Sequence, residues 1–385
     1  MKILVLGGDG YLGWPTALHL SAAGHQVAVA DNFARRGYDH ELGVESLVPI
    51  EPLQARVAVW RELTGQSIPV LVGDLTDPVF CHRMIAGFGP DAVVHFAEQR
   101  AAPYSMIDRA HAVYTQQNNV LGNLNLLFAI AETDPDIHLV KLGTLGAYGT
   151  PNIDIEEGWL EVEYKGRRDK VPYPMRPGSF YHLSKVHDSH NIEFACRVWN
   201  LRATDLNQGV VYGQQTAETA RDERLATRFD YDAVFGTVLN RFVIQAVLGH
   251  PLTVYGTGGQ TRGMIDIRDT VRCVQLACEN PADRGEYRVF NQITESMTVQ
   301  QMAEAVAAAS PEQVTIEHLD NPRVELSGHY YNVTHTKLID LGLDPHLLTG
   351  TLIGSLLDIT KRYAHRARPD ALLPTINWRH PATGT

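Results

Sequence analysis

The feature that most constrains this chain is a glycine-rich turn close to its first residue. An apolar, strand-like run from Ile3 to Leu6 leads directly into the turn GGDGYLG, and a helical stretch follows from Pro15 to Ala23. The glycines fit both G-x-G-x-x-G and G-x-x-G-x-x-G, and Gly7, Gly10 and Gly13 carry the second spacing. Glycines tighten such a turn and let its backbone approach a pyrophosphate, whose charge is favoured at the N-terminus of the next helix. A strand, this turn and a helix together predict a dinucleotide-binding unit.

An acidic residue at the end of the next strand-like run indicates which dinucleotide binds. Asp31 follows the run from Gln26 to Ala30 and lies 21 residues after Gly10. A carboxylate there can accept both ribose hydroxyls and repels a 2′-phosphate, so NAD is favoured over NADP. Arg35 and Arg36 are close enough in the sequence to leave NADP open.

The alternation of strand and helix continues along the chain. Short apolar runs at 70–72, 92–95 and 138–141 end in polar or small residues, and a long helical stretch, about 110–132, separates the last two. This order predicts an α/β fold, a doubly wound parallel Rossmann sheet with right-handed crossovers. Asp74, just after the third run, either meets an adenine amino group or is an ordinary turn or capping aspartate, and both interpretations stay open.

Two long segments and a less regular second half complete the organisation. Segments 32–68 and 150–179 interrupt the alternation, and excursions of this length are typically lids or binding loops. In the second half we expect helices near 237–248 and 269–279 and short strands at 252–255 and 287–290. We therefore expect a Rossmann domain at 1–207 that contains both insertions. The remainder, 208–385, is expected to be mainly a smaller mixed α/β substrate-binding lobe whose chain crosses back to the first domain.

The composition disfavours several classes of function. Lys and Arg number 33 against 44 Asp and Glu, and the net charge of −11 argues against a general nucleic-acid or membrane-surface binder. With no leader pattern and no run of about 18 apolar residues, we expect a cytoplasmic protein without a membrane-spanning helix. The four cysteines form no C-x-x-C pair and are expected to be thiols in a reducing compartment. His187 and His190 lack a third ligand at suitable spacing, so no metal is expected.

The second strong signal is the sequence YHLSK at residues 181–185. Its spacing of four places Tyr181 and Lys185 on one face of a helix. An ammonium beside a phenol lowers the pKa of the phenol, so the tyrosine can take the proton from a sugar hydroxyl while hydride leaves the carbon for NAD. Y-x-x-x-K is common by chance, but here the glycine turn precedes it and Thr144 ends an intervening strand-like run. The combination is far more specific than the spacing alone.

These residues together resemble the extended short-chain dehydrogenase/reductase superfamily, whose members act on nucleotide sugars. Within it, the chain is similar over nearly its whole length to the UDP-sulfoquinovose synthase family. Besides GGDGYLGW (7–14), the resemblance lies in DNFARR (31–36), HFAEQRAAPYSM (95–106), KLGTLGAYG (141–149), FYHLSKVHDSHN (180–191), TDLNQGVVYG (204–213) and GQTRGMIDIRDT (259–270). Asp9 and His182 in particular fit this family rather than a generic epimerase.

The resemblance implies conversion of UDP-glucose and sulfite into UDP-sulfoquinovose on one retained NAD. Tyr181 would deprotonate the 4-hydroxyl while C4 gives hydride to NAD⁺, and the 4-ketone then makes C5–H acidic. Water leaves from C6 to give a 4-keto-5-ene, sulfite adds to C6, and protonation at C5 and hydride return to C4 complete the cycle. Thr144 would bond the C4 oxygen. His182 would shuttle a proton at C5 or C6, because the unperturbed pKa of histidine lies near neutrality.

The remaining contacts are expected on the same basis. The cofactor set is Gly7, Gly10, Tyr11, Gly13, Asp31, Asn32, Arg35, Asp74, Leu75, Phe96, Asn118 and Lys185. Among the substrate residues, Arg100 would meet sulfite or the sugar, and the diphosphate would be held by Asn207, Arg262 and Arg323. The uridine pocket would be lined by Gln208, Thr237 and Tyr255. Superfamily members dimerise through the helices that correspond to 110–132 and 182–199, so a homodimer is expected.

Two departures from the family keep other activities open. Leu145 stands where Met is expected and Ala147 where Glu is expected, so the strand-end segment has no acid–base carboxylate. This argues against an ordinary nucleotide-sugar 4,6-dehydratase and leaves use of sulfite open, with His182 as a hypothetical replacement for the missing carboxylates. The alternatives are a nucleotide-sugar 4-epimerase and an unsaturated-ketosugar-forming dehydratase of secondary metabolism, since both keep the same Tyr, Lys and Thr. A non-catalytic dinucleotide-sensing regulator is disfavoured because Tyr181 and Lys185 are both present.

Overall fold

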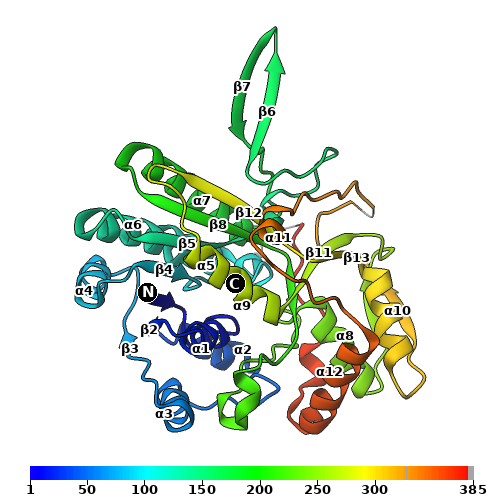
Figure 1. The fold of residues 1–385 in the computed structure, drawn as a ribbon. Helices are drawn as coiled ribbons and strands as arrows, with labels where there is room; N and C mark the ends of the chain where they lie inside the picture. Colours follow the sequence, from blue (N-terminus) through cyan, green and yellow to red (C-terminus); the bar gives the residue numbers. More distant parts are fainter. Residues whose placement is uncertain (327, 380–385) are drawn as a thin grey trace.

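Seven parallel strands form the central sheet of the computed structural model, which describes residues 1–326 and 328–379 (Figure 1). Their order is β12-β8-β5-β4-β1-β2-β3, and every neighbouring pair is parallel. The strands are β1 (Lys2–Leu6), β2 (Gln26–Asp31), β3 (Val70–Val72), β4 (Ala92–His95), β5 (His138–Thr144), β8 (Arg202–Gln208) and β12 (Tyr287–Gln292). The predicted doubly wound Rossmann fold is therefore confirmed.

Strand β1 shows why helices cover both faces of this sheet. After Lys2 its residues are all apolar, and alternate side chains point to opposite faces. Ile3 and Val5 pack with the side of the sheet covered by α1 (Gly13–Ala22) and α9 (Ile267–Glu279). Leu4 and Leu6 pack against α4 (Pro78–Phe88), α6 (Gly122–Thr133) and α7 (Phe180–Trp199) on the other side.

Two segments differ from their expected form. Segment 32–68 contains two helices, α2 (Ala34–Leu42) and α3 (Leu53–Thr64), and the buried Trp60 ties α3 to the core beside β2. The single helix expected at 110–132 is α5 (Arg109–Gln116), a π-helical turn at Gln117–Leu121, and then α6. Such π turns interrupt helices frequently at functional sites.

The second half of the chain builds a smaller lobe and returns to the sheet. Strands β9 (Val210–Tyr212), β11 (Thr261–Asp266) and β13 (Glu295–Thr298) form one small sheet, and β10 (Leu252–Tyr255) pairs with β14 (Ile316–Leu319). Helices α8 (Val238–Val247), α10 (Val299–Ala309) and α12 (Gly350–Tyr363) share one apolar cluster. Strand β12 lies between these elements in sequence but pairs with β8 in the central sheet. The division of the chain at residue 207 remains a prediction.

Short helical elements complete the fold. Helix α11 spans Lys337–Asp340, and single 3-10 turns lie at Tyr104–Met106, Leu145–Ala147, Thr219–Arg221, Glu223–Leu225, Ala364–Arg366 and Pro369–Ala371. Within residues 1–326 and 328–379, no helix combines the length and apolar character needed to cross a membrane.

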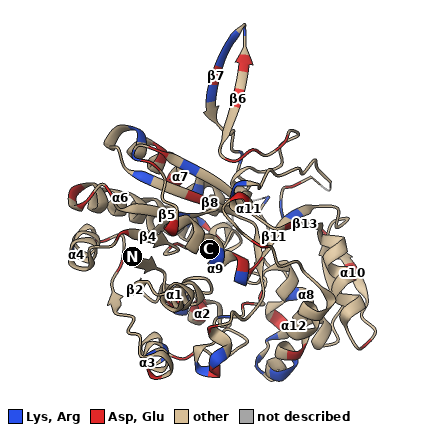
Figure 2. Cartoon of the chain, viewed as in Figure 1, with Lys and Arg blue, Asp and Glu red and all other residues tan. Residues whose placement is uncertain are grey.

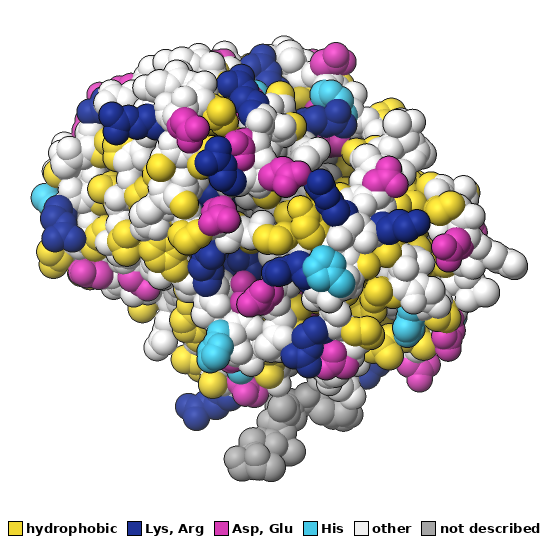
Figure 3. Space-filling view, turned by 90° about the horizontal axis from the view of Figure 1, so that it is seen from below, with side chains coloured by type: hydrophobic (Ala, Val, Ile, Leu, Met, Phe, Trp, Pro, Cys, Tyr) yellow, Lys and Arg dark blue, Asp and Glu magenta, His cyan; other side chains and the backbone are white. Residues whose placement is uncertain are grey.

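A β-hairpin within segment 150–179 projects from the body of the molecule (Figure 1). It consists of β6 (Trp159–Tyr164) and β7 (Arg167–Pro172), which pair in antiparallel fashion. Basic side chains lie mainly on β7 and acidic ones on β6 (Figure 2). On the face of the molecule seen in Figure 3, basic, acidic and apolar side chains are interspersed, so no single charge dominates the described residues of that face.

Candidate active site

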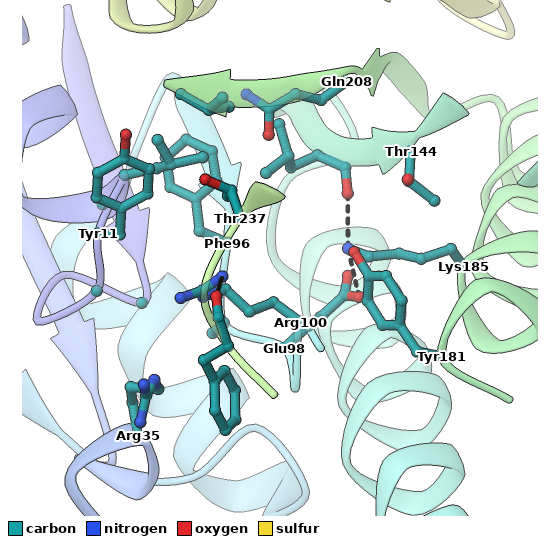
Figure 4. Close-up of a pocket in the computed structure, with 18 of the residues that line it drawn as sticks. Tyr11, Arg35, Phe96, Glu98, Arg100, Thr144, Tyr181, Lys185, Gln208 and Thr237 are labelled. Atoms are coloured by element: carbon teal, nitrogen blue, oxygen red, sulfur yellow. Dashed lines mark hydrogen bonds and ion pairs between the residues drawn. The ribbon is translucent and has the colours of Figure 1, made fainter. Parts of the chain in front are cut away.

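One cavity lies where β1, β2, β4 and β5 end, between the sheet and the smaller lobe. It encloses about 2100 Å³, including the space open to solvent. Crevices at the carboxyl ends of parallel strands are the usual ligand sites of doubly wound folds. Figure 4 shows Thr144, Tyr181, Lys185 and Glu98 on one side of the cavity, and Tyr11 and Arg35 on the other.

Most residues predicted for the site line this cavity. They include the whole predicted cofactor set, three of the four catalytic residues (Thr144, Tyr181 and Lys185), and Arg100, Gln208, Thr237, Tyr255, Arg262 and Arg323. His182 and Asn207 are not among the lining residues. The fold thus brings residues that are far apart in the sequence into one site.

The glycine turn has the geometry that a pyrophosphate needs. Gly7 has a positive φ of 84°, and the backbone N–H of Gly10 donates to its carbonyl at 3.1 Å. A Cβ atom at Gly13 would lie 2.0 Å from the same carbonyl oxygen, so no larger residue fits there. No side chain caps the N-terminus of α1, and the backbone from Gly10 to Gly13 lines the cavity. The turn therefore leaves a cradle that fits the phosphates of a dinucleotide.

Asp31 is fixed by the turn itself. Its carboxylate accepts the backbone N–H groups of Asp9 at 2.8 Å and Phe33 at 2.7 Å. The carboxylate of Asp9 in turn binds Arg36 at 2.7 Å and the fully buried Arg56 at 2.5 Å. Arg36, which left NADP open in the sequence, is therefore already paired and is not a free partner for a 2′-phosphate.

Asp74 takes part in a local turn and also lines the cavity. Its carboxylate accepts the backbone N–H and the hydroxyl of Thr76 at 2.8 and 2.7 Å and the side-chain amide of Asn32 at 2.8 Å. The turn interpretation is correct, and because Asn32 and Asp74 both line the cavity, a contact with adenine stays a prediction.

A segment of the second half covers the cavity. Within residues 226–237, which we call the covering segment, Ala233, Phe235, Gly236 and Thr237 line the cavity. The hydroxyl of Thr227 donates to the carbonyl of Tyr11 at 2.7 Å, so the segment crosses directly over the glycine turn. Among the described lining residues, none comes from 150–179. The excursion expected to close over the site is a projecting hairpin instead.

Buried Asp230 fastens the covering segment to the Rossmann part of the chain. It pairs with Arg35 at 3.0 Å, with Arg228 at 3.4 Å, and with Arg100. Burial alone would raise the pKa of this carboxyl, but the three arginines hold it well below its usual range. The Phe235 ring lies 3.8 Å from the guanidinium carbon of Arg35. Arg100, predicted to meet sulfite or the sugar, is therefore engaged by the covering segment.

The predicted catalytic pair, Tyr181 and Lys185, lies on α7, which begins where the hydroxyl of Ser179 accepts the backbone N–H of His182 at 3.1 Å. Lys185 is buried. Its ammonium donates to the carbonyl of Leu142 at 2.7 Å and lies 2.5 Å from the Glu98 carboxylate. Its nitrogen is 5.9 Å from the centre of the Tyr181 ring. The predicted arrangement of Tyr181 and Lys185 on one helix face is present.

Glu98 was missed by the sequence reasoning. Its side chain is only 1% exposed and lines the cavity, three residues after β4 ends. The available signal was a carboxylate directly beyond a predicted strand, on the edge of the sheet where ligands bind. Lys185 was expected to lower the pKa of Tyr181, but burial raises it and the negative charge of Glu98 raises it further. The expected lowering of the Tyr181 pKa is therefore wrong.

Thr144 ends β5 with its side chain at the cavity. Its hydroxyl oxygen accepts the backbone N–H of Gly146 at 3.1 Å, which leaves the hydroxyl proton free to be donated. This arrangement suits a hydrogen bond to an oxygen on a bound sugar, as predicted for Thr144.

Three arginines meet at the far end of the cavity. Arg262 lies 2.5 Å from Glu325, and Arg323 contacts the Trp378 ring at 5.0 Å. Burial, with a smaller effect of the neighbouring Arg262, lowers the pKa of Arg323 to about 10. Arg241 on α8, which was not predicted, lines the cavity beside Tyr255. Its position within an apolar helical stretch gave no sign of a ligand role.

Comparison with known proteins places the chain in a family. The profile of the NAD dependent epimerase/dehydratase family matches residues 3–291. The chloroplastic UDP-sulfoquinovose synthase of Spinacia oleracea is 57% identical over 381 residues, which cover 98% of this chain and 79% of that protein. The UDP-sulfoquinovose synthase of Sulfolobus acidocaldarius is 44% identical over 387 residues, covering 99% of this chain and 98% of that protein. This chain belongs to the UDP-sulfoquinovose synthase family.

Solved structures agree on the fold. The UDP-glucose 4-epimerase of Thermus thermophilus, in complex with NAD, has a TM-score of 0.65 and 24% identity, covering 93% of this chain and 98% of that one. The UDP-glucose 4-epimerase of Bifidobacterium longum, in complex with NAD⁺ and UDP, has a TM-score of 0.70 and 18% identity, covering 94% of this chain and 98% of that one. As a member of the UDP-sulfoquinovose synthase family, the chain is an NAD-dependent enzyme of the extended short-chain dehydrogenase/reductase type, and NAD is confirmed as its cofactor.

The two departures from the expected residues of the UDP-sulfoquinovose synthase family lie outside the cavity lining. Leu145 and Ala147 are 7% and 2% exposed, and Leu145 belongs to an apolar cluster with Tyr148 and Tyr173. Neither side chain lines the cavity. The presence of Ala147 in place of the expected glutamate therefore changes the packing behind the cavity rather than the cavity surface.

His182, a residue that fits the UDP-sulfoquinovose synthase family, is partly buried against the turn at Leu145–Ala147. Its Nδ1 lies 3.0 Å from the Ser179 hydroxyl, and a Cβ atom at Gly146 would lie 2.3 Å from its Nε2. Burial, and then the charges of Arg323 and Arg262, lower the pKa of His182 to about 3. The near-neutral pKa expected from the sequence is wrong, and the ring stays neutral at physiological pH.

Asn207 is a structural residue in this arrangement. Its amide donates to the hydroxyl of Tyr148 at 2.7 Å, and that hydroxyl donates to Asn291 at 2.9 Å. Asn207 is 1% exposed and pairs in register with Gly143 on β5. Because its side-chain amide donates inside the protein and Asn207 does not line the cavity, the geometry gives no support to the predicted contact with the diphosphate.

Proposed function

We propose that this protein converts UDP-glucose and hydrogen sulfite into UDP-sulfoquinovose and water, with NAD retained through the cycle. The observation that carries the proposal is the meeting of Thr144, Tyr181 and Lys185 with the glycine turn and Asp31 in one cavity. The similarity to two UDP-sulfoquinovose synthases over nearly the whole chain supports this choice of substrates.

The residues of the cavity fit NAD. The backbone of the glycine turn would hold the pyrophosphate, Asp31 the hydroxyls of the adenosine ribose, and Lys185 the nicotinamide ribose. When bound, NAD supplies the acceptor for the C4 hydride and returns the hydride at the end of the cycle. The arginines at the other end, Arg262 and Arg323 together with the unpredicted Arg241, would hold the diphosphate of the sugar nucleotide.

The reacting end of the cavity supplies the proton chemistry. In its phenolate form, Tyr181 takes the proton from the 4-hydroxyl, and Thr144 donates a hydrogen bond to the same oxygen. The resulting 4-ketone stabilises a carbanion at C5 as an enolate, so the C6 hydroxyl leaves as water. Sulfite adds through sulfur to C6, C5 regains a proton, and Tyr181 returns its proton to the C4 oxygen when the ketone is reduced. The sum is exchange of one hydroxyl for one sulfonate, without net oxidation.

A homodimer forms part of this proposal. Helices α5, α6 and α7 and the π-helical turn between α5 and α6 expose large apolar side chains in the described structure: Val113, Leu121, Phe128, Phe194 and Val198 are 42–51% exposed. Phe128 of α6 and Trp199 of α7 lie 4.8 Å apart between ring centres, so part of this apolar set is continuous across the two helices. A face of this kind suits the four-helix packing expected from the sequence.

We also propose that the protein works in the cytoplasm. All four cysteines, Cys81, Cys196, Cys273 and Cys278, are buried free thiols. Free thiols persist in a reducing compartment.

Mass spectrometry of the reaction mixture tests the function. The purified protein is incubated with UDP-glucose, with and without sulfite, beside a Tyr181→Phe variant. A sulfonated nucleotide sugar that needs both sulfite and Tyr181 supports the proposal. A product of unchanged mass indicates the 4-epimerase, and loss of water without sulfite addition indicates the ketosugar-forming dehydratase. No change with any nucleotide sugar would favour the regulator.

A further inference from the structure

The cavity places one buried carboxylate directly against the catalytic lysine. Glu98 lies 2.5 Å from the Lys185 ammonium, and their side chains are 1% and 4% exposed (Figure 4). Apart from Glu98, the described structure gives this ammonium one hydrogen-bond acceptor, the carbonyl of Leu142. Lys185 is therefore held between one charged and one neutral oxygen, both delivered by the ends of neighbouring strands.

This contact changes what the lysine can do for the tyrosine. An isolated ammonium stabilises a nearby phenolate, but an ammonium paired with a carboxylate presents little net charge. The negative charge of Glu98 acts on Tyr181 directly, since it is the largest cause after burial that raises the pKa of the phenol. In this chain, Glu98 therefore has to be considered together with Tyr181 and Lys185.

We propose that Glu98 is a positioning residue that holds Lys185 beside Tyr181 and offsets its charge, so that the tyrosine remains protonated to higher pH than the lysine alone would allow. This inference rests on the proposed oxidation at C4, because it concerns the base of that step. It assigns a role to a carboxylate that neither binds the cofactor phosphates nor contacts the nucleotide end of the cavity.

The other ionisable groups near Glu98 and Tyr181 do not replace this charge. His95 of β4 lies 3.6 Å from Glu98, and burial lowers its pKa to about 4, so the ring is neutral near pH 7. Burial, and next Glu98 itself, raise the pKa of Asp188 on α7 well above its ordinary value, which disfavours a second negative charge beside Tyr181. Two cations also face Tyr181: Lys141 of β5 pairs with Asp205 at 3.3 Å, and Arg100 pairs with Asp230.

The substitution that tests this proposal is Glu98→Gln, because it keeps the shape of the side chain and removes its charge. Glu98→Asp keeps the charge, and Glu163→Gln on the exposed hairpin is a control of the same chemistry away from the cavity. Each holoenzyme is titrated by the ultraviolet absorbance of tyrosinate, and the same protein with Tyr181→Phe is subtracted to isolate Tyr181. In parallel, NADH absorbance after addition of UDP-glucose without sulfite gives the pH profile of the C4 oxidation.

In Glu98→Gln, both midpoints are expected to move to lower pH by about one pH unit or more. Glu98→Asp and Glu163→Gln should keep the midpoints of the wild type. Unchanged midpoints in Glu98→Gln, or an equal movement in Glu163→Gln, would overturn the proposal. A merely structural role would lower the yield or the stability of the variant without moving either midpoint.

A second comparison remains decisive if Glu98→Gln does not fold. Lys185→Met leaves Glu98 as the only charge of the pair, and adding Glu98→Gln to it should lower the tyrosinate midpoint; no change would contradict the proposal. The titration needs no turnover, so its result stands apart from the proposed function. If wild-type protein forms no NADH with UDP-glucose, the proposed function fails while the tyrosinate midpoints still decide the role of Glu98.

Discussion

The carboxylate of Asp9 and the guanidinium of Arg56 lie 2.5 Å apart beneath the glycine turn, and their side chains are 2% and 0% exposed. Arg56 also lies over the Trp14 ring at 4.7 Å. Since Asp9 occupies the turn itself, this pair links the pyrophosphate cradle to helix α3, more than forty residues further along the chain.

Replacing Asp9 with Asn is expected to lower the free energy of unfolding by about 3–5 kcal/mol, because it leaves a buried guanidinium without its counter-charge. Denaturant unfolding of the holoenzyme measures the effect. Glu163→Gln, which breaks a pair on the exposed hairpin, should change stability little. Equal stabilities of the two variants would show that the Asp9 pair does not hold the turn.

A second prediction concerns Asp230 and the retention of NAD. Asp230→Asn removes the charge that fastens the covering segment to Arg35 and Arg100, so NAD is expected to dissociate about tenfold faster, or ~1.4 kcal/mol. Release of NAD from the purified holoenzyme measures this rate. Asp370→Asn at an exposed pair is the control. An unaltered rate in Asp230→Asn would mean that the covering segment does not retain the cofactor.

The same contact has a defined pH dependence. The arginines hold the pKa of Asp230 below its usual range. The ion pairs of Asp230 therefore contribute fully above the ordinary aspartate pKa of about 4, and their contribution is lost as the pH falls through the lower pKa of the folded protein. Retention of NAD through this contact should therefore be constant between neutral and mildly acidic pH. A loss of retention centred near neutrality would point to another group.

His182 allows a test of proton transfer at C5. We expect His182→Ala to slow the exchange of the C5 hydrogen of UDP-glucose with deuterated solvent by about a hundredfold, the lower range for loss of a general acid or base. Because the pKa of His182 is lowered to about 3, its titration should give no break in the exchange profile near pH 6.5. Exchange at the wild-type rate in His182→Ala would rule out the proton shuttle.

The apolar face of α6 and α7 predicts the oligomeric state. Phe128→Glu and Phe194→Glu place charges on side chains that are 50% and 48% exposed, so each should convert a dimer into a monomer. Light scattering measures the molar mass. Val79→Glu on α4, where the side chain is 70% exposed, is a control that should not change it. A monomeric wild type, or a dimer that tolerates both charges, would contradict the assignment.

Local patterns in the sequence predicted a large part of the site. The glycine turn and the four-residue spacing of Tyr181 and Lys185 lie within single elements, so periodicity and strand ends reveal them. Glu98, Arg56 and Arg241 become functional neighbours only when distant segments meet, and no spacing encodes that meeting. The low pKa of His182 and the internal hydrogen bonds of Asn207 follow from burial, which the resemblance could not supply.

The structures of the two long insertions could not be predicted from the sequence either. Segments 32–68 and 150–179 were both expected as lids or loops, but one packs two helices near the turn and the other projects as a hairpin. The covering segment at 226–237 had no regular pattern that distinguished it. Its position depends on Asp230 meeting arginines from two other parts of the chain.

The fate of the C6 hydroxyl tests the central claim most directly. UDP-glucose that carries heavy oxygen at C6 is incubated with the holoenzyme and sulfite, and the nucleotide sugars and released water are analysed by mass spectrometry. We predict that the label leaves as water one for one with the gain of a sulfonate, and that neither change occurs with Tyr181→Phe. A product that keeps its labelled oxygen, or loses it without taking up sulfite, would contradict the account.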